Sequence, residues 1–174
     1  MGDLDGMLWE LEAAESEAEA FDILAGGFAA ALRTQSDGDV DWLAHRAPRS
    51  RRAAWALSHL VWDGGAVVGI LGLNLVADAY IRYGPPPGGH WQDGWADGAL
   101  RGAFESEPAS WCVSAISRVL NGVSDDRMIE WIGADLVEEL LRFRREETEP
   151  LLVRAAADAP SLRTALAVAE RLVP

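Results

Sequence analysis

The sequence predicts an all-α protein, and three observations support that prediction. Apolar residues recur at spacings of three and four through most of the chain, which is the period of an amphipathic helix. Glycine and proline gather at a few positions that would separate one helix from the next. Strand-like alternation is weak, and hydrophobic residues make up 49% of the chain, enough for a folded core despite the net charge of -13.

The first element is an N-terminal helical arm over residues 1–41. Its apolar positions follow the coiled-coil spacing at Leu4, Met7, Leu11, Ala14, Ala18, Phe21, Ala25, Phe28 and Leu32. This pattern predicts one apolar face on a single long helix, or on two helices broken near Gly26 and Gly27. We expect the face to pack on the protein's own domain. A parallel homodimer would place like charges opposite one another beside the seam, and the oligomeric state otherwise stays open.

The arm is strongly acidic, because residues 1–41 hold eleven carboxylates and one arginine, a net charge of -10. The rest of the chain carries only -3. Such a segment repels phosphate backbones and anionic lipid, so we expect no direct nucleic-acid or membrane binding through it. It favours a basic protein partner, for which the candidate binding residues are Glu10, Glu12, Glu15, Glu17 and Glu19.

A cluster of positive charge follows the arm, at the start of a helical domain predicted over residues 42–174. Its members are Arg46, Arg49, Arg51 and Arg52. They are interpreted as an internal counter-charge for the acidic arm and a solvated loop, and the alternative is a site for phosphate or an acidic ligand.

The periodicity then predicts helices over 52–62 and 66–82, followed by a connection that begins with the run of glycine and proline from Gly84 to Gly89. This connection includes His90, Trp91 and Trp95. Exposed aromatic residues on a connection are typical anchors for a partner, so these three residues are further binding candidates. The alternative is that the two tryptophans cover the helical core.

A second helical set is predicted from Pro108, with further breaks marked by Gly133, Pro150 and Pro160, and both prolines suit the first turn of a new helix. Residues 52–82 and 108–142 are similar to one another, with Gly72 aligned on Gly133, and helices over 143–174 complete the domain. Two related helical units predict a bundle or a short HEAT-like stack.

Three stretches near the C-terminus carry a family resemblance. They are Glu107-Pro108-Ala109-Ser110-Trp111, Ala134-Asp135-Leu136-Val137-Glu138-Glu139-Leu140-Leu141 and Ala157-Asp158-Ala159-Pro160-Ser161-Leu162-Arg163-Thr164-Ala165-Leu166. Here the chain resembles a family of small bacterial all-helical domains with an A-G-P-L-E-D-L-L-like motif. Asp135-Leu136 replaces the family's Gly-Pro, the first stretch is shortened, and one residue is inserted before Pro160. The resemblance covers less than half of the chain and implies a helical fold and no chemistry.

The segment Asp135-Leu136-Val137-Glu138 has the pattern of a capping box, in which the aspartate would accept from first-turn amides and the glutamate would reach back. This predicts that a helix begins at Asp135. The alternative is functional, with Glu138 or Glu139 presenting a carboxylate to a partner or acting as a general acid or base.

Motifs of catalysis and of metal or cofactor binding are missing from the sequence. The three histidines form no metal-binding spacing, and neither a phosphate loop nor a nucleophile elbow is present. Cys112 is expected to be a small buried apolar residue. We therefore predict no cofactor, no metal site and no enzymatic activity.

The expected location is the cytoplasm of a bacterium. The chain has one cysteine, its first ten residues lack the pattern of a secretory signal, and the apolar run Ala66–Ala77 is shorter than a membrane span. All fifteen basic residues are arginine, which together with the abundant alanine and glycine fits a GC-rich genome.

Three functions remain compatible with the sequence. The leading interpretation is a non-enzymatic immunity or inhibitor-type protein that occludes a basic toxin or nuclease, because a small acidic fold suits that electrostatic task. The second is a structural or adaptor subunit of a larger assembly. The third is an enzyme whose site is not visible in the sequence.

Overall fold

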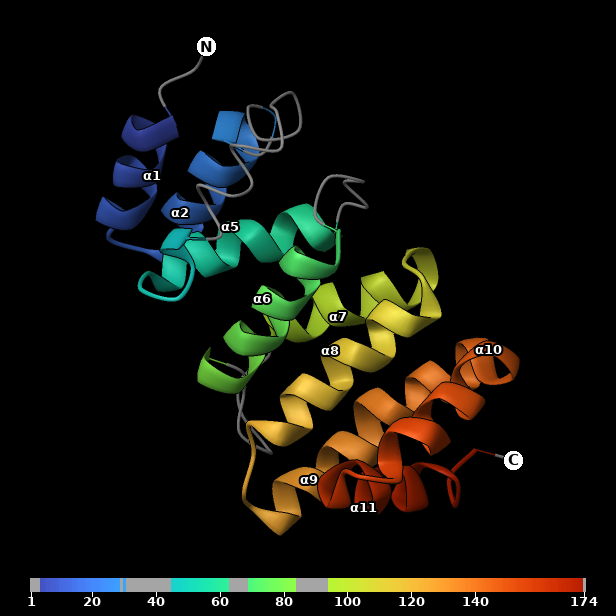
Figure 1. The fold of residues 1–174 in the computed structure, drawn as a ribbon. Coiled ribbons are helices and arrows are strands. Elements are labelled where there is room, and N and C mark those ends of the chain that lie inside the picture. The colour runs from blue at the N-terminus through green and yellow to red at the C-terminus, as the bar shows by residue number, and fades with distance from the viewer. Residues whose placement is uncertain (1–3, 29, 31–44, 63–68, 84–93, 174) are drawn as a thin grey trace.

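The computed structural model describes residues 4–28, 30, 45–62, 69–83 and 94–173, and every element of secondary structure in these ranges is helical (Figure 1). The all-α class predicted from the sequence is confirmed. The elements are α1 (Leu4–Ala13), α2 (Glu17–Ile23), the π-helix η1 (Leu24–Phe28), α5 (Arg51–Trp62), α6 (Gly69–Tyr83), α7 (Trp95–Ser106), α8 (Ala109–Asn121), α9 (Asp126–Ile132), the π-helix η3 (Gly133–Val137), α10 (Glu138–Ala156) and α11 (Pro160–Ala169).

The helices stack along an elongated molecule. Figure 1 shows α1 and α2 at one end, α6, α7 and α8 in the middle, and α9, α10 and α11 at the other end. Helix α5 packs on α6 and α7, helix α6 packs on α7 and α8, and α10 packs on α7, α8 and α11. Neighbouring helical hairpins therefore share one continuous apolar core, as expected for a helical bundle or stack.

The N-terminal arm breaks earlier than its seam predicts, between α1 and α2. Ser16 is the N-cap of α2, because its hydroxyl accepts a hydrogen bond from the backbone amide of Glu19 at 3.1 Å. The carboxylate of Glu19 in turn accepts from the amide of Glu15 at 2.8 Å. The predicted break near Gly26 and Gly27 is wrong, since the chain there continues from α2 as the π-helix η1.

This break changes which face of α2 is buried. The buried residues of α2 and η1 are Ala20, Leu24 and Phe28. The seam correctly includes Phe28, but it also predicts burial for Ala18, Phe21 and Ala25, which are all exposed. The prediction fails for those three residues because one register cannot continue through the non-helical residues between α1 and α2.

Helix α7 lies where the sequence was interpreted as a connection. Its buried face consists of Ala96, Ala99, Leu100, Ala103 and Phe104. Its C-terminal end is completed from α10, because the guanidinium of Arg144 donates to the carbonyl oxygens of Phe104 and Glu107. The connection predicted as far as Pro108 is therefore too long, and α7 is a central helix of the core.

The predicted capping box at Asp135 is wrong, because no helix begins there. The flanking residues Ile132 (φ -59°, ψ -37°) and Val137 (φ -71°, ψ -40°) both have α-helical backbone conformations. Asp135 thus lies inside a helical segment that runs from α9 through η3 into α10. The N-cap of this segment is Asp125, whose carboxylate accepts from the amide of Met128 at 3.0 Å.

The two C-terminal prolines differ in their positions. Pro160 is in the first turn of α11, as predicted. Pro150 lies inside α10, so the prediction that it opens a helix is wrong. The interruption of α10 is at Arg144 instead, whose backbone is non-helical at φ -142° and ψ 42°.

The two segments predicted to be related are each helical. Residues 52–82 contain α5 and α6, whereas residues 108–142 contain α8, α9, η3 and the start of α10. The aligned glycines Gly72 and Gly133 are both buried. Helix α7 lies between the segments and belongs to neither, and their origin by duplication stays a prediction.

Candidate functional site

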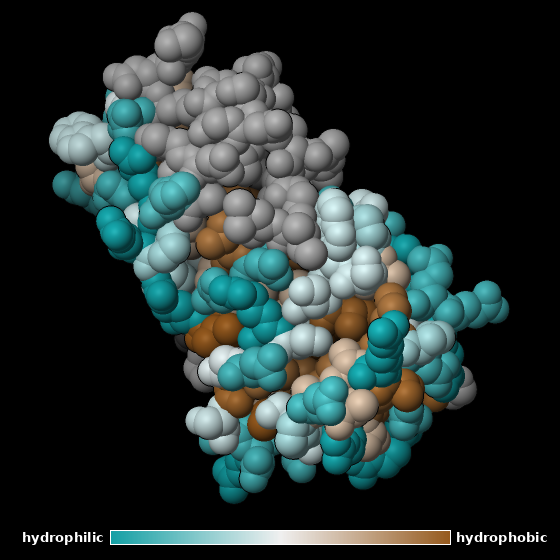
Figure 2. All heavy atoms as spheres, in the orientation of Figure 1, coloured by the Kyte–Doolittle hydropathy of each residue, from teal (hydrophilic) through white to brown (hydrophobic). Residues whose placement is uncertain are grey.

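The most acidic surface of the described molecule lies on α1 and α2. We define the acidic face as five exposed carboxylates of α1, α2 and the residues between them: Glu10, Glu12, Glu15, Glu19 and Asp22. Figure 2 shows hydrophilic side chains gathered over this end of the molecule. The side chain of Glu17, the remaining glutamate predicted here, lies outside the described residues.

Within the described residues, little of this negative charge is neutralised by ion pairs. Arg46 pairs with Asp5, with 2.6 Å between Nη2 and Oδ1, which confirms that this arginine is an internal counter-charge. Among the described carboxylates of α1 and α2, Asp5 is the one that forms an ion pair. Arg52 lies over the ring of Trp55 at 5.2 Å. The acidic face itself therefore stays available to an external positive charge.

Two large apolar side chains are exposed on the same pair of helices. Trp9 of α1 is 70% exposed and Phe21 of α2 is 49% exposed. Trp9 has Asp5 four residues before it and Glu12 three residues after it, spacings that place all three on one helix face. An aromatic side chain amid carboxylates combines an apolar anchor with electrostatic recognition, and tryptophan is enriched among the residues that dominate binding energy.

The aromatic candidates of the predicted connection do not form an exposed surface in the described residues. Trp95 is the first residue of α7 and packs partly buried against the core. Its ring lies 6.1 Å from that of Tyr83, tilted by 38°. This matches the alternative in which tryptophan covers the core. His90 and Trp91 lie outside the described residues.

A second polar feature connects α6, α7, η3 and α10. We call it the Arg101 cluster, and it consists of Tyr80, Asp97, Arg101, Asp135 and Glu139. Arg101 Nε is 2.8 Å from an oxygen of Asp97, and Nη2 is 2.6 Å from an oxygen of Asp135. The third nitrogen, Nη1, pairs with Glu139. One guanidinium thus holds three carboxylates from three elements.

Two polar atoms of the cluster are buried and have no hydrogen-bond partner among the described residues, Tyr80 Oη and Asp97 Oδ1. Burial raises the pKa of Tyr80, and the negative charges of Asp97 and Asp135 raise it further. Burial also raises the pKa of Asp97, an effect that its hydrogen bond to Arg101 opposes. The phenol is therefore neutral, and burial makes the Asp97 carboxyl easier to protonate than an exposed aspartate.

The two C-terminal carboxylates predicted to bind a partner are both engaged within the chain. Glu138 is only 7% exposed and pairs with Arg142, one turn further along α10. Glu139 belongs to the Arg101 cluster. These contacts do not favour a role for either residue in binding a second protein.

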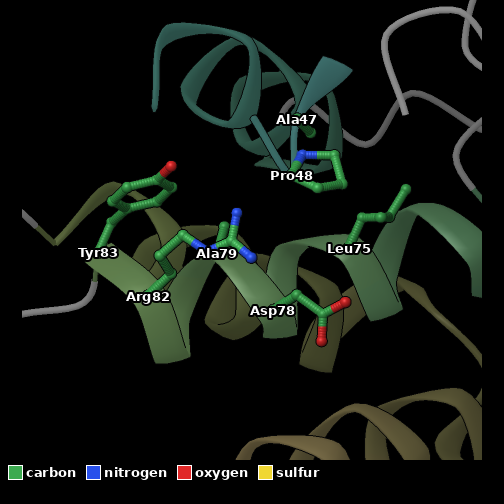
Figure 3. Close-up of a pocket in the computed structure, with 7 residues that line it drawn as sticks. All are labelled: Ala47, Pro48, Leu75, Asp78, Ala79, Arg82 and Tyr83. Carbon is green, nitrogen blue, oxygen red and sulfur yellow. The ribbon is translucent and has the colours of Figure 1, made fainter. Parts of the chain in front are cut away.

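A shallow hollow lies between α6 and the turn before α5, and Figure 3 shows its seven lining residues. It encloses about 30 Å³. Small-molecule sites generally enclose more, about 300 to 1,000 Å³. Its acidic residue, Asp78, is already held by Arg118 of α8 through two hydrogen bonds of 2.5 and 2.7 Å. The hollow therefore offers little chemistry for recognising a ligand.

Among the described residues, the cysteine and the potential metal ligands form no reactive cluster. Cys112 is fully buried, as predicted, and burial raises its pKa to about 11, so the thiol is a poor nucleophile at neutral pH. Across the ranges that the structure describes, no three His, Cys, Asp or Glu side chains lie close enough to hold a metal ion. Within those same ranges, no helix is both long enough and apolar enough to cross a membrane.

Comparison with known proteins found no match among family models, curated protein sequences or solved structures. The resemblance of the C-terminal stretches to small bacterial helical domains therefore stays a prediction. Arguments about function rest on the geometry and charge of this chain.

Proposed function

We propose that this protein binds a basic partner protein through the acidic face of α1 and α2. The observation that carries the proposal is the set of exposed carboxylates that form no ion pair within the described residues, together with the exposed Trp9. Clustered like charges repel one another and lower the stability of a compact chain. A complementary surface on a partner would remove that repulsion on binding.

The two kinds of side chain would contribute differently to such a complex. Exposed carboxylates mainly accelerate the encounter with an oppositely charged partner, and they suppress encounters with acidic proteins. Burial of Trp9 and Phe21 under the partner would lengthen the lifetime of the complex, because buried aromatic anchors mostly change the dissociation rate. Together they would give a fast and durable complex.

In a more specific form of this proposal, the partner is a basic toxin or nuclease. Binding would occlude the active surface of that partner, as an immunity or inhibitor-type protein does. An enzyme that acts on nucleic acid presents positive charge to phosphates. The acidic face would compete for that charge. The support for this form is the charge complementarity alone.

The test compares two variants in which five charges are removed. The first replaces Glu10, Glu12, Glu15, Glu17 and Glu19 by glutamine, which keeps good helix formers in place. The control replaces Glu105, Glu130, Glu146 and Glu170 by glutamine and Asp158 by asparagine, all exposed residues outside α1 and α2. Both variants have the same net charge, so a difference between them depends on where the charge lies.

A partner captured from the native host with the unaltered protein should associate at least tenfold more slowly with the first variant than with the control. Its association rate with the unaltered protein should also fall steeply with salt, because the Debye length is only about 10 Å at 0.1 M. Equal rates for the two variants would contradict the proposal. If the captured partner keeps its own activity in the complex, the protein is an adaptor and the inhibitor form is wrong.

A further inference from the structure

The Arg101 cluster carries more negative charge than its guanidinium can balance. Asp97, Asp135 and Glu139 all pair with Arg101, so the ionised cluster has a formal excess of two negative charges. The four side chains are only 21% to 29% exposed. Repulsion between charges is stronger in such a partly buried place than in water. A proton bound by one carboxylate would relieve it.

The hydrogen bonds single out Asp97 as the carboxylate that takes the proton. Its Oδ2 accepts from Arg101, while its Oδ1 is buried without a partner among the described residues. Tyr80 is only 5% exposed, and its hydroxyl oxygen is also buried and unpartnered within that part of the chain. A proton on Asp97 Oδ1 would turn this atom into a donor. The charge of Asp97 also acts on Tyr80, whose pKa it raises, so a proton on Asp97 would lower the negative potential at the buried phenol as well.

We propose that Asp97 is protonated in the folded protein at mildly acidic pH, and that loss of this proton weakens the packing of α7 against η3 and α10. The groups that face Asp97 are Tyr80 from α6, Arg101 from α7, Asp135 from η3 and, across the guanidinium, Glu139 from α10. Helices α5 and α8 also pack on α7, and their described buried side chains carry no charge. The protonation state of Asp97 thus controls how strongly α7 packs in the middle of the stack.

The direction of the pH dependence follows from the raised pKa of Asp97. Burial is the largest cause, Asp135 adds to it, and Arg101 opposes it. The folded protein therefore binds a proton that the unfolded chain releases at about pH 4. This contribution to stability is complete below the unfolded pKa and is lost as pH rises through the folded pKa. A carboxylate stabilised only by an ion pair would give the opposite slope.

The first experiment is urea unfolding of the unaltered protein and Asp97→Asn from about pH 4 to about pH 8. Asparagine keeps an oxygen for Arg101 and does not titrate. As pH rises, the folding equilibrium constant of the unaltered protein should fall relative to that of Asp97→Asn, by up to about tenfold per pH unit within the window. Asp158→Asn, the same change at an exposed site, should run parallel to the unaltered protein.

A carbon-13 NMR titration of the carboxyl groups tests the proposal without relying on a variant that folds. The Asp97 carboxyl of the unaltered protein should titrate above the ordinary aspartate value of about 3.9. In Asp135→Asn its midpoint should move to lower pH, because one of the charges that raises it is gone. Titration of Asp97 at or below the ordinary value, or an Asp97→Asn profile parallel to that of the unaltered protein, would overturn the proposal.

Discussion

The two π-helices in the described part of the chain, η1 and η3, share a local backbone but differ in what surrounds them. Both begin or continue at the end of a short α-helix, and both contain glycine. A Cβ on Gly133 in η3 would lie 2.5 Å from the carbonyl oxygen of Ala165 in α11, which is closer than atoms can pack. A Cβ on Gly26 or Gly27 in η1 would meet no atom within 4 Å.

This difference indicates that the glycines have separate physical roles. Gly133 allows the backbone of α11 to approach the helical segment that begins at Asp125, so its missing side chain is part of tertiary packing. No neighbouring atom would clash with a methyl group on the glycines of η1. These glycines lower the stability of the fold, because glycine loses more backbone freedom on folding than other residues do. A glycine in a π-helix is therefore understood only from its neighbours across the core.

The largest expected effect is that of Gly133→Ala, which should lower the free energy of unfolding by about 3 kcal/mol. The added methyl group meets backbone atoms of Ala165, which cannot move without shifting α11. Urea unfolding monitored by circular dichroism measures the change. In the control Gly122→Ala, the methyl group meets the end of the Ile81 side chain, which can rotate away, so the loss should be well under half as large. Equal losses of stability in the two variants would contradict the idea that backbone contact makes Gly133 the more sensitive site.

The next effect is at the Arg101 cluster, which pairs η3 with α7. Arg101→Gln leaves three carboxylates without a cation and should cost about 2 kcal/mol at neutral pH. Arg118→Gln removes an ion pair with Asp78 that is much more exposed, so it should cost under about 1 kcal/mol. Thermal unfolding of both variants in parallel decides the order. A reversed order would mean that exposure does not govern the strength of these pairs.

The smallest effect is a gain in stability in the other π-helix. Gly26→Ala should raise the free energy of unfolding by about 0.5 to 1 kcal/mol, because alanine restricts the unfolded chain and fits the open space around η1. The midpoint of urea unfolding should increase without a change in slope. A loss of stability would show that η1 needs the freedom of glycine and would remove the difference between the two segments.

Local sequence patterns were sufficient for most helices and for the helical class. The boundaries of α5 and the start of α8 near Pro108 follow from apolar spacing and from proline. The break after α1 was also present as a Ser16-x-x-Glu19 capping signal. The longer apolar seam continues through this signal and conceals it. The structure follows the short capping pattern at Ser16 and not the longer apolar seam.

The Arg101 cluster could not be derived from the sequence because its members come from distant elements. Helix α7 carries Asp97 and Arg101 at a spacing of four, and its apolar residues recur at spacings of three and four, so this signal could have identified the helix. The pairing of Arg101 with Asp135 depends on how α7 packs against η3. At Asp135 the capping pattern was misleading, since tertiary packing keeps the chain helical on both sides of it.

The hydrogen bonds from Arg144 to the end of α7 have a consequence during synthesis of the chain. Arg144 follows Glu107 by 37 residues, so at about 5 to 20 residues per second it leaves the ribosome roughly 2 to 7 s later. Until then the last carbonyl oxygens of α7 lack the guanidinium that completes the helix. During synthesis, the carbonyl oxygens at the C-terminal end of α7 thus lack their Arg144 donor for several seconds. A pause in translation just before Arg144 would prolong that interval.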